Sequence, residues 1–186
     1  YYGDTGKQVI TESQEPGPDF LSHVCNLWEE AAKAAEVGGI RTVLLRMGVG
    51  LSCKGGALEK LIAAPVGYVR RFGDGKQIFS WLSMDDLIAA ILHCLVTETL
   101  SGPVNLVSPS PVTNEEMIST MAELTNRPFL PGVSARLLKL MYGDMAREIL
   151  LSGCNASCRK LEESGFRFYH KTLEEALRSQ LGIYNY

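Results

Sequence analysis

Apolar and polar positions near the start of the chain predict a helix followed by a buried strand. After a polar loop, apolar side chains recur every three or four positions, which is typical of one face of a helix. That face consists of Phe20, Val24, Leu27, Trp28 and Ala31. Asp19 is a suitable cap, and we expect the helix to run to about Glu36 and to end at Gly38 and Gly39. The apolar run over residues 42–45 predicts a short strand, so the order indicates the βα rhythm of a parallel sheet.

Short elements separated by turns follow in the rest of the first half. The turn Gly73-Asp74-Gly75 comes before a stretch with strand character. We expect a glycine-rich loop over 48–56, a helix over 57–64, a strand over 77–82, a helix from Asp85 or Asp86 to about Val96, and a strand over 104–107.

Two capping boxes mark helices in the second half. In a capping box a threonine oxygen accepts from the third helical N–H, and a glutamate three residues on reaches back to the N–H of the cap. The boxes are Thr113 with Glu116, opening a helix to about Thr125, and Thr172 with Glu175, opening a helix to about Leu181. Further helices are expected over 134–141, 144–151 and 159–163. The first half is thus predicted to be α/β and the second mostly helical.

The composition is that of an ordinary globular protein. Apolar residues make up 46% of the 186 positions and charged residues 21%, enough to bury a real core. The net charge of −3 argues against a nucleic-acid partner, because nucleic-acid binders usually carry a basic excess. No apolar run approaches the roughly 20 residues that span a bilayer, so no membrane association is expected.

The five cysteines indicate neither a disulfide framework nor a metal site. Their number is odd, and their spacing fits no zinc pattern. A reducing compartment is therefore expected, either the cytoplasm or an organelle matrix, and not secretion.

The glycine-rich loop after the strand at 42–45 is the first candidate for cofactor chemistry. Gly48, Gly50, Gly55 and Gly56 resemble a dinucleotide fingerprint, in which glycines let the backbone approach a pyrophosphate. Cys53, however, occupies the place of the third glycine. We therefore interpret the segment as a tight loop beside a site rather than as a fingerprint.

Cys25 is a candidate nucleophile on the first helix. Glu29 lies four residues on and shares its helical face, whereas His23 points elsewhere. A cysteine nucleophile needs a positioned base. Local sequence supplies none on the right face, so the favoured interpretation is a small buried apolar residue.

Two charged clusters each allow two interpretations. The Gly73-Asp74-Gly75 turn is flanked by Arg70, Arg71 and Lys76. These cations either bind an anion or simply make the turn basic and solvated. Asp85 and Asp86 are either paired acids or, as favoured, caps of the next helix, where carboxylates complement the helix dipole.

Taken together, the motifs resemble the extended short-chain dehydrogenase/reductase superfamily, also called the NAD-dependent epimerase/dehydratase group. The shared pieces, in order, are Tyr2-Gly3, Thr11-Glu12, Leu45-Arg46, Gly73-Asp74-Gly75-Lys76-Gln77, Asp85-Asp86 and Gly102-Pro103-Val104-Asn105. The closer resemblance is to the atypical YfcH-like "epimerase family" branch. Its marks here include Trp28-Glu29, Arg46-Met47-Gly48-Val49, Arg127-Pro128, Gly143-Asp144 and Leu173-Glu174-Glu175-Ala176-Leu177.

The resemblance implies an α/β fold: the C-terminal part of a Rossmann-type parallel sheet plus a small, mainly helical α+β substrate lobe. Residues 1–50 and about 77–107 would supply the last βα units and strands of the Rossmann-type domain. Residues 51–76 and 108–186 would form the substrate-binding lobe. By the same resemblance, the part with the glycine fingerprint would precede Tyr1.

The chain departs from the superfamily at its catalytic positions. The usual Tyr-x-x-x-Lys pair, which supplies the acid/base and holds the nicotinamide ribose, falls on Cys25 and Glu29. An Arg-Asp pair that contacts nucleotide-sugar phosphates falls on Phe79 and Ser80. A UDP-sugar substrate is therefore disfavoured.

The resemblance implies NADP as cofactor, with NAD as an alternative, and a small-molecule substrate of unknown identity. Arg46, Met47, Gly48 and Val49 are the expected cofactor contacts, with Cys25 and Tyr2 as candidate catalytic residues and no metal. We expect these side chains in a cleft at the C-terminal edge of the sheet, which would be lined by Tyr2, Cys25, Arg46, Met47 and Trp81.

Three functional hypotheses follow. The first is an NADP(H)-binding epimerase- or reductase-like protein. The second is a non-catalytic scaffold that senses a cofactor or binds a partner, and the third is a thiol enzyme using Cys25. Besides the cofactor, the expected partners are the chain's own N-terminal part or a second copy in a homo-oligomer.

Overall fold

The computed structural model describes residues 1–63 and 67–183. The helices are α1 (Phe20–Val37), α2 (Gly56–Ala63), α3 (Met84–Val96), α4 (Asn114–Thr125), α5 (Ala135–Met145), the π-helical turn η1 (Ala146–Leu150), α6 (Arg159–Glu163) and α7 (Leu173–Leu181). The strands are β1 (Val9–Ile10), β2 (Val43–Met47), β3 (Val49–Leu51), β4 (Val69–Phe72), β5 (Ile78–Phe79), β6 (Trp81–Ser83), β7 (Gly102–Leu106), β8 (Val112–Thr113), β9 (Phe129–Val133) and β10 (Asn155–Ala156).

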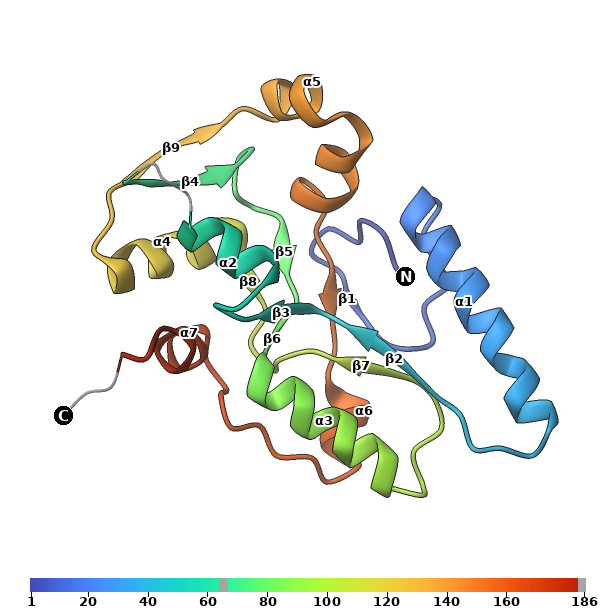
Figure 1. Ribbon diagram of the computed structural model, residues 1–186. Helices are drawn as coiled ribbons and strands as arrows, with labels where there is room; N and C mark the ends of the chain where they lie inside the picture. Colours follow the sequence, from blue (N-terminus) through green and yellow to red (C-terminus); the bar gives the residue numbers. More distant parts are fainter. Residues whose placement is uncertain (64–66, 184–186) are drawn as a thin grey trace.

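Parallel strand pairs at the centre of the molecule define an α/β fold, as the sequence predicted. Strand β2 pairs with β7, β3 with β6, β1 with β10 and β4 with β9, all in parallel, whereas β5 and β8 are antiparallel. In Figure 1, α1 lies on one side of these central pairs and α2, α4 and α7 lie on the other. Helix α5 is at the top of the same view.

Strands β2 and β3 form one extended segment that changes its partner at Gly48. The N–H of Gly48 donates to the carbonyl of Leu106 at 3.0 Å, and the N–H of Val49 donates to the carbonyl of Ser80 at 2.8 Å. A Cβ atom at Gly48 would lie 2.5 Å from that same carbonyl oxygen of Ser80. Only glycine therefore allows the two strand pairs to approach this closely.

The described residues form two buried apolar clusters. They lie on either side of Gly48, where the strand changes its partner. One cluster packs β7, α3 and α6 together, and its buried members include Leu82, Ala90, Val104, Leu106, Leu161 and Phe166. The other packs β3, α4 and α7 together, and its buried members include Leu51, Trp81, Met117, Ile118 and Leu177. Successive strand residues point to opposite faces, so Trp81 and Leu82 enter different clusters.

The helix boundaries follow the predicted caps in most places. The Asp19 carboxylate accepts from the N–H of Ser22 and Gly38 ends α1, as expected. Both predicted capping boxes are present, at Thr113 and Thr172. Helix α6 has the predicted bounds. In these segments a local side-chain hydrogen bond is enough to set the helix end.

Two segment predictions were wrong, because tertiary pairing overrides local pattern. The expected loop over 48–56 contains β3, and the expected strand over 77–82 is divided at Ser80 between β5 and β6. Arg70 and Arg71 lie on strand β4, which pairs with β9 and leads into the expected Gly73-Asp74-Gly75 turn. The end of the helix predicted over 57–64 lies outside the described residues.

Asp86 is buried in the first turn of α3 and does not cap it. The cap is Ser83, whose hydroxyl accepts from the N–H of Asp86, so the predicted capping by Asp85 or Asp86 was wrong. The Asp86 carboxylate accepts instead from the Ser83 hydroxyl at 2.7 Å and from the N–H groups of Tyr169 and His170 at 2.7 and 3.1 Å. This carboxylate thereby holds the segment before α7 against α3.

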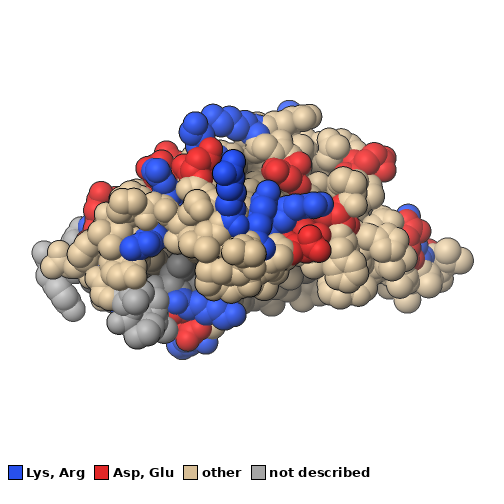
Figure 2. Space-filling view, turned by 90° about the horizontal axis from the view of Figure 1, so that it is seen from above, with Lys and Arg blue, Asp and Glu red and all other residues tan. Residues whose placement is uncertain are grey.

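The surface seen from above Figure 1 carries charges of both signs. Figure 2 shows lysine and arginine interspersed with aspartate and glutamate, without a broad area of one sign. Among the helices of residues 1–63 and 67–183, none is both long and apolar enough to cross a bilayer. The same residues contain no group of three or more histidine, cysteine or acidic side chains placed to hold a metal ion.

We predict that Gly48→Ala lowers the free energy of unfolding by about 1–3 kcal/mol, because its methyl group forces the two strand pairs apart. Gly50→Ala is the matched control, since a Cβ there would meet only the side chains of Leu87 and Met84, at 3.7 and 3.9 Å. Urea unfolding followed by circular dichroism measures both variants. Equal stability of the two would contradict the role given to Gly48.

Candidate functional site

A cleft of about 710 Å³ opens beside β2 and past its C-terminal end. Its wall comes from segments that are far apart in the sequence: residues 1–3, the first half of α1, β2 and the start of β3, residues 78–80, the end of β7, and residues 148–156. Tyr2, Cys25, Arg46, Met47, Gly48 and Val49 all line it. The structure thus brings the two candidate catalytic residues and the four expected cofactor contacts to one cavity; their roles remain predictions.

Arg46 is bound to the protein on several sides. Its Nε and Nη2 donate to the two carboxylate oxygens of Glu29 at 2.7 and 2.8 Å. Its Nη1 donates to the Tyr2 hydroxyl at 2.9 Å and to the carbonyl of Glu12 at 3.0 Å. The centre of the guanidinium lies 3.4 Å from the centroid of the Tyr1 ring. One side chain therefore joins β2, α1 and the first residues of the chain.

The Arg46–Glu29 pair is largely shielded from water, with side chains 7% and 14% exposed. Burial alone would lower the pKa of Arg46, but hydrogen bonds to Glu29 and Tyr2 hold it above its ordinary value. A two-pronged pair of this kind fixes orientation as well as charge. Glu29, at the position of the superfamily lysine, thus accepts from Arg46 and adds no cation to the cleft.

The Tyr2 hydroxyl is held between two partners. It donates to the side-chain oxygen of Asn105 at 2.6 Å and accepts from Arg46. Burial raises its pKa above the ordinary value of 10.0, against the opposing effects of Arg46 and Asn105. The hydroxyl is therefore a neutral, oriented group on the cleft wall.

Asn105 and Glu12 complete this network, and only their place in the family motifs pointed to them beforehand. Asn105 is fully buried on β7, opposite Arg46 in the β2–β7 register. Its backbone N–H donates to the Glu12 carboxylate at 2.9 Å, and its side-chain amide donates to the carbonyl of Ser157 at 3.1 Å. An asparagine on a buried strand therefore orients the tyrosine.

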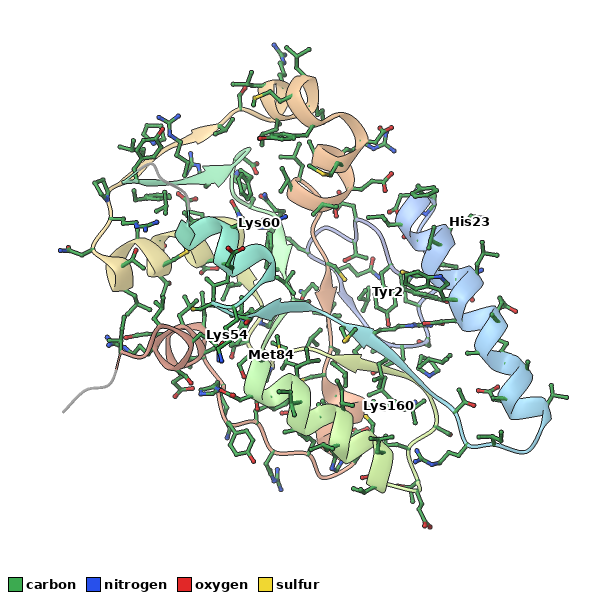
Figure 3. The ribbon with its side chains drawn as sticks, viewed as in Figure 1. Tyr2, His23, Lys54, Lys60, Met84 and Lys160 are labelled. Atoms are coloured by element: carbon green, nitrogen blue, oxygen red, sulfur yellow. The ribbon has the colours of Figure 1, made fainter. Side chains whose placement is uncertain are left out.

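Cys25 lies on the wall formed by α1, one helical turn before Glu29. His23 does not line the cleft, and Figure 3 shows it on the side of α1 away from Tyr2. Among the described residues no base is hydrogen-bonded to the Cys25 thiol. A second thiol, Cys154, also lines the cleft, and burial raises its pKa.

Trp81 was wrongly expected to line the cleft. It is fully buried in the cluster with β3, α4 and α7, and its indole N–H donates to the carbonyl of Ser110 at 2.8 Å. The pleat of the strand explains the difference, because it directs Ser80 toward the cleft and Trp81 away from it.

Gly48 and Val49 do not offer a phosphate cradle. The backbone N–H groups of Gly48 and Val49 are used in strand pairing, and the lack of a side chain at Gly48 is required by Ser80 within the protein. Met47 and Val49 nevertheless line the cleft, and Met47 is 58% exposed. Contact between this turn and a cofactor would therefore be through side chains and surface rather than through a ring of free N–H groups.

The basic cluster at Arg70 and Arg71 lies outside the cleft. Arg71 forms an ion pair with Glu115, and the guanidinium of Arg70 lies over the Tyr68 ring at 4.9 Å. Neither side chain adds positive charge to the cleft wall.

Loss of the buried pair should be costly for folding. We predict that Glu29→Ala lowers the free energy of unfolding by about 3 kcal/mol, because it removes the carboxylate that balances the largely buried charge of Arg46. The neighbouring Glu30→Ala removes only an exposed pair with Lys33 and should cost less than about 1 kcal/mol. A double-mutant cycle of Glu29→Ala with Arg46→Met in urea measures the coupling. A coupling energy near zero would refute the pair as a stabilising contact.

Known proteins resemble this chain over nearly its full length. A model of a domain of unknown function, DUF1731, matches residues 133–180. The epimerase family protein Mb2239 of Mycobacterium bovis is 41% identical over 181 residues, which cover 95% of this chain and 59% of that protein. YfhF of Bacillus subtilis, another epimerase family protein, is 36% identical over 183 residues, 97% of this chain and 59% of that protein. The chain therefore spans about three-fifths of the length of these relatives.

Solved structures show the same relationship. The human epimerase family protein SDR39U1, crystallised with NADPH, superposes with a TM-score of 0.85 and 28% identity, over 98% of this chain and 62% of that one. MoeE5 with UDP-glucuronic acid and NAD superposes with a TM-score of 0.73 at 22% identity, over 98% of this chain and 60% of that one, which shows a shared fold. The chain belongs to the epimerase family within the NAD-dependent epimerase/dehydratase superfamily and matches the C-terminal portion of its Rossmann-like fold.

Proposed function

We propose that this chain forms the substrate-facing wall of the cofactor cleft in an NADP(H)-binding epimerase- or reductase-like protein. The observation that carries the proposal is the convergence of Tyr2, Cys25, Arg46 and Met47 on one cavity. Human SDR39U1 superposes on 98% of this chain and was crystallised with NADPH. That structure supports NADP(H) rather than NAD as the cofactor that we propose. Its substrate is a small molecule that the family relationship does not define.

The division of labour we propose follows the contacts of the cleft. A bound nicotinamide would supply or accept a hydride. Arg46 would fix the end of β2 and the Tyr2 hydroxyl, so its role is positioning, since its Nε and Nη1 already donate to protein groups. Met47, Gly48 and Val49 would form the surface against which the cofactor lies.

The proton chemistry we propose differs from that of the superfamily. Glu29 stands where the lysine would hold the ribose and is committed to Arg46, so it cannot lower the pKa of a neighbouring acid. The groups on the wall that could give a proton include the neutral Tyr2 hydroxyl and the thiols of Cys25 and Cys154. Our candidates for this proton transfer are Tyr2 and Cys25.

A second candidate function rests on the same Arg46–Glu29 pair. Because Glu29 replaces the catalytic lysine and is paired with Arg46, the cleft would serve equally as a cofactor-sensing surface without turnover. A sensor binds NADP(H) without any substrate-dependent oxidation, which separates the two functions.

The division into a Rossmann-type part over residues 1–50 and about 77–107 and a substrate lobe over 51–76 and 108–186 belongs to the same proposal. This division agrees with the cleft wall, which contains residues of the proposed Rossmann-type part and of the proposed substrate lobe. A reducing compartment suits the five free cysteines, and one relative, from Arabidopsis thaliana, is named chloroplastic.

We predict that NADPH binds a form extended before Tyr1 by the fingerprint-bearing part that the family resemblance implies. Arg46→Ala in that form should weaken binding by about tenfold or more, or about 1.4 kcal/mol, because the Tyr2 hydroxyl and the end of β2 lose their anchor. Arg70→Ala is the control, since it removes the same charge outside the cleft. Isothermal titration calorimetry measures all three forms.

Absence of NADPH binding by the extended form would overturn the proposal. An equal loss in Arg70→Ala and Arg46→Ala would show a general effect of charge and remove the role given to the cleft.

A further inference from the structure

The described wall of the cleft is acidic rather than basic. Its charged lining residues are Asp19, Glu29, Arg46 and Glu148. Arg46 is neutralised by Glu29, and the Asp19 carboxylate accepts from an N–H of α1. The Glu148 side chain makes no hydrogen bond or ion pair with another described residue, so it adds an uncompensated negative charge. An anionic substrate group beside Glu148 would meet repulsion, and the one cationic side chain among the described lining residues, Arg46, is already paired.

Lysines of the chain lie elsewhere. Figure 3 shows Lys54, Lys60 and Lys160 away from Tyr2, and none of them is among the lining residues. The ammonium group of Lys160 donates to the carbonyls of Ser101 and Pro103, at 2.8 and 2.7 Å. No described lysine is therefore in place to receive a phosphate in the cleft.

The position that binds phosphate in the superfamily is also closed to it here. Phe79 is apolar, and the Ser80 hydroxyl donates to the carbonyl of Cys154 at 2.7 Å while accepting from the N–H of Ala156 at 2.9 Å. Both hydrogen-bonding directions of this serine are used within the protein. At Phe79 and Ser80 the wall therefore offers a substrate neither a charged group nor a free hydroxyl.

Large apolar side chains face the cleft from three elements. Trp28 on α1 is 71% exposed, Met47 at the end of β2 is 58% exposed and Ile149 in η1 is 53% exposed, and all three line the cavity. Burial of such surface by a ligand is favourable in proportion to its area. The Trp28 ring also offers a face that attracts cations.

We propose that the cleft takes an apolar substrate without phosphate or carboxylate groups, whose polar end is uncharged or a cationic nitrogen received by Glu148. This inference deepens the proposed function and rests on it for the reaction, but the recognition chemistry is independent of the cofactor. It places nucleotide sugars outside the substrate range of the site.

Two dyes of nearly the same shape test the proposal on the N-terminally acetylated 186-residue chain, because a free ammonium at Tyr1 would add a cation beside Cys154 in the cleft. N-phenyl-1-naphthylamine is neutral, and 8-anilino-1-naphthalenesulfonate has the same ring systems plus a sulfonate. We expect the neutral dye to bind at least about tenfold more tightly in a fluorescence titration, because the sulfonate meets Glu148. UDP-glucose at millimolar concentration should not displace it. Tighter binding of the sulfonate, or displacement by UDP-glucose, would overturn the proposal.

Three variants localise the effect. Glu148→Lys should tighten the sulfonate dye by about tenfold and change the neutral dye less than about twofold, because it supplies the missing cation. Glu98→Lys makes the same charge change at an exposed site outside the cleft and should leave both dyes unchanged. Trp28→Ala should weaken the neutral dye about fivefold, since it removes part of the apolar wall. Equal effects of Glu98→Lys and Glu148→Lys, or full binding in Trp28→Ala, would refute the assignment.

These titrations need no cofactor, so they separate the two claims. NADPH binding with a preference for the sulfonate dye would overturn the substrate class alone. The predicted dye preference without NADPH binding by the extended form would overturn the proposed function alone.

Discussion

The buried ion pair between Arg46 and Glu29 is the contact on which the cleft depends. It crosses from β2 to α1, and the same guanidinium reaches Tyr2 and the carbonyl of Glu12. Removing one partner of such a pair leaves a charge in a poorly solvated place, which costs far more than the loss of a surface contact. The helix, the strand and the first residues of the chain therefore hold their positions together.

A second constraint is the change of strand partner at Gly48, which sets the positions of the backbone segments that line the cleft. Because β2 follows β7 and β3 follows β6, the backbone passes close to the carbonyl of Ser80. The arrangement directs Ser80 toward the cavity and Trp81 into the core. The same geometry explains why the glycine is needed for packing, before any ligand is considered.

Local signals in the sequence were sufficient for much of the fold. The caps at Asp19, Thr113 and Thr172 could be predicted because a side chain within three residues forms the bond. Strand β4 and the division between β5 and β6 could not, because their partners β9 and β8 lie far along the chain. Pairing of this kind is decided by tertiary context rather than by local pattern.

The site shows the same limit. Family motifs brought Tyr2, Cys25 and Arg46 forward, and the structure places all three on one cavity. The motifs gave no signal that Arg46 would be held by Glu29, since that bond joins residues 17 positions apart on different elements. Nor could they show that Glu148 lines the cleft, because it belongs to η1, about a hundred residues after β2.

The central claim is that the cleft beside Met47 receives the nicotinamide cofactor. The most direct test is the ¹³C-methyl methionine NMR spectrum of the extended form during addition of NADPH. We expect the Met47 methyl signal to move, because this exposed side chain lines the cleft, and the signals of Met117 and Met121 in the core to stay in place. An unmoved Met47 signal at saturating NADPH would contradict the account.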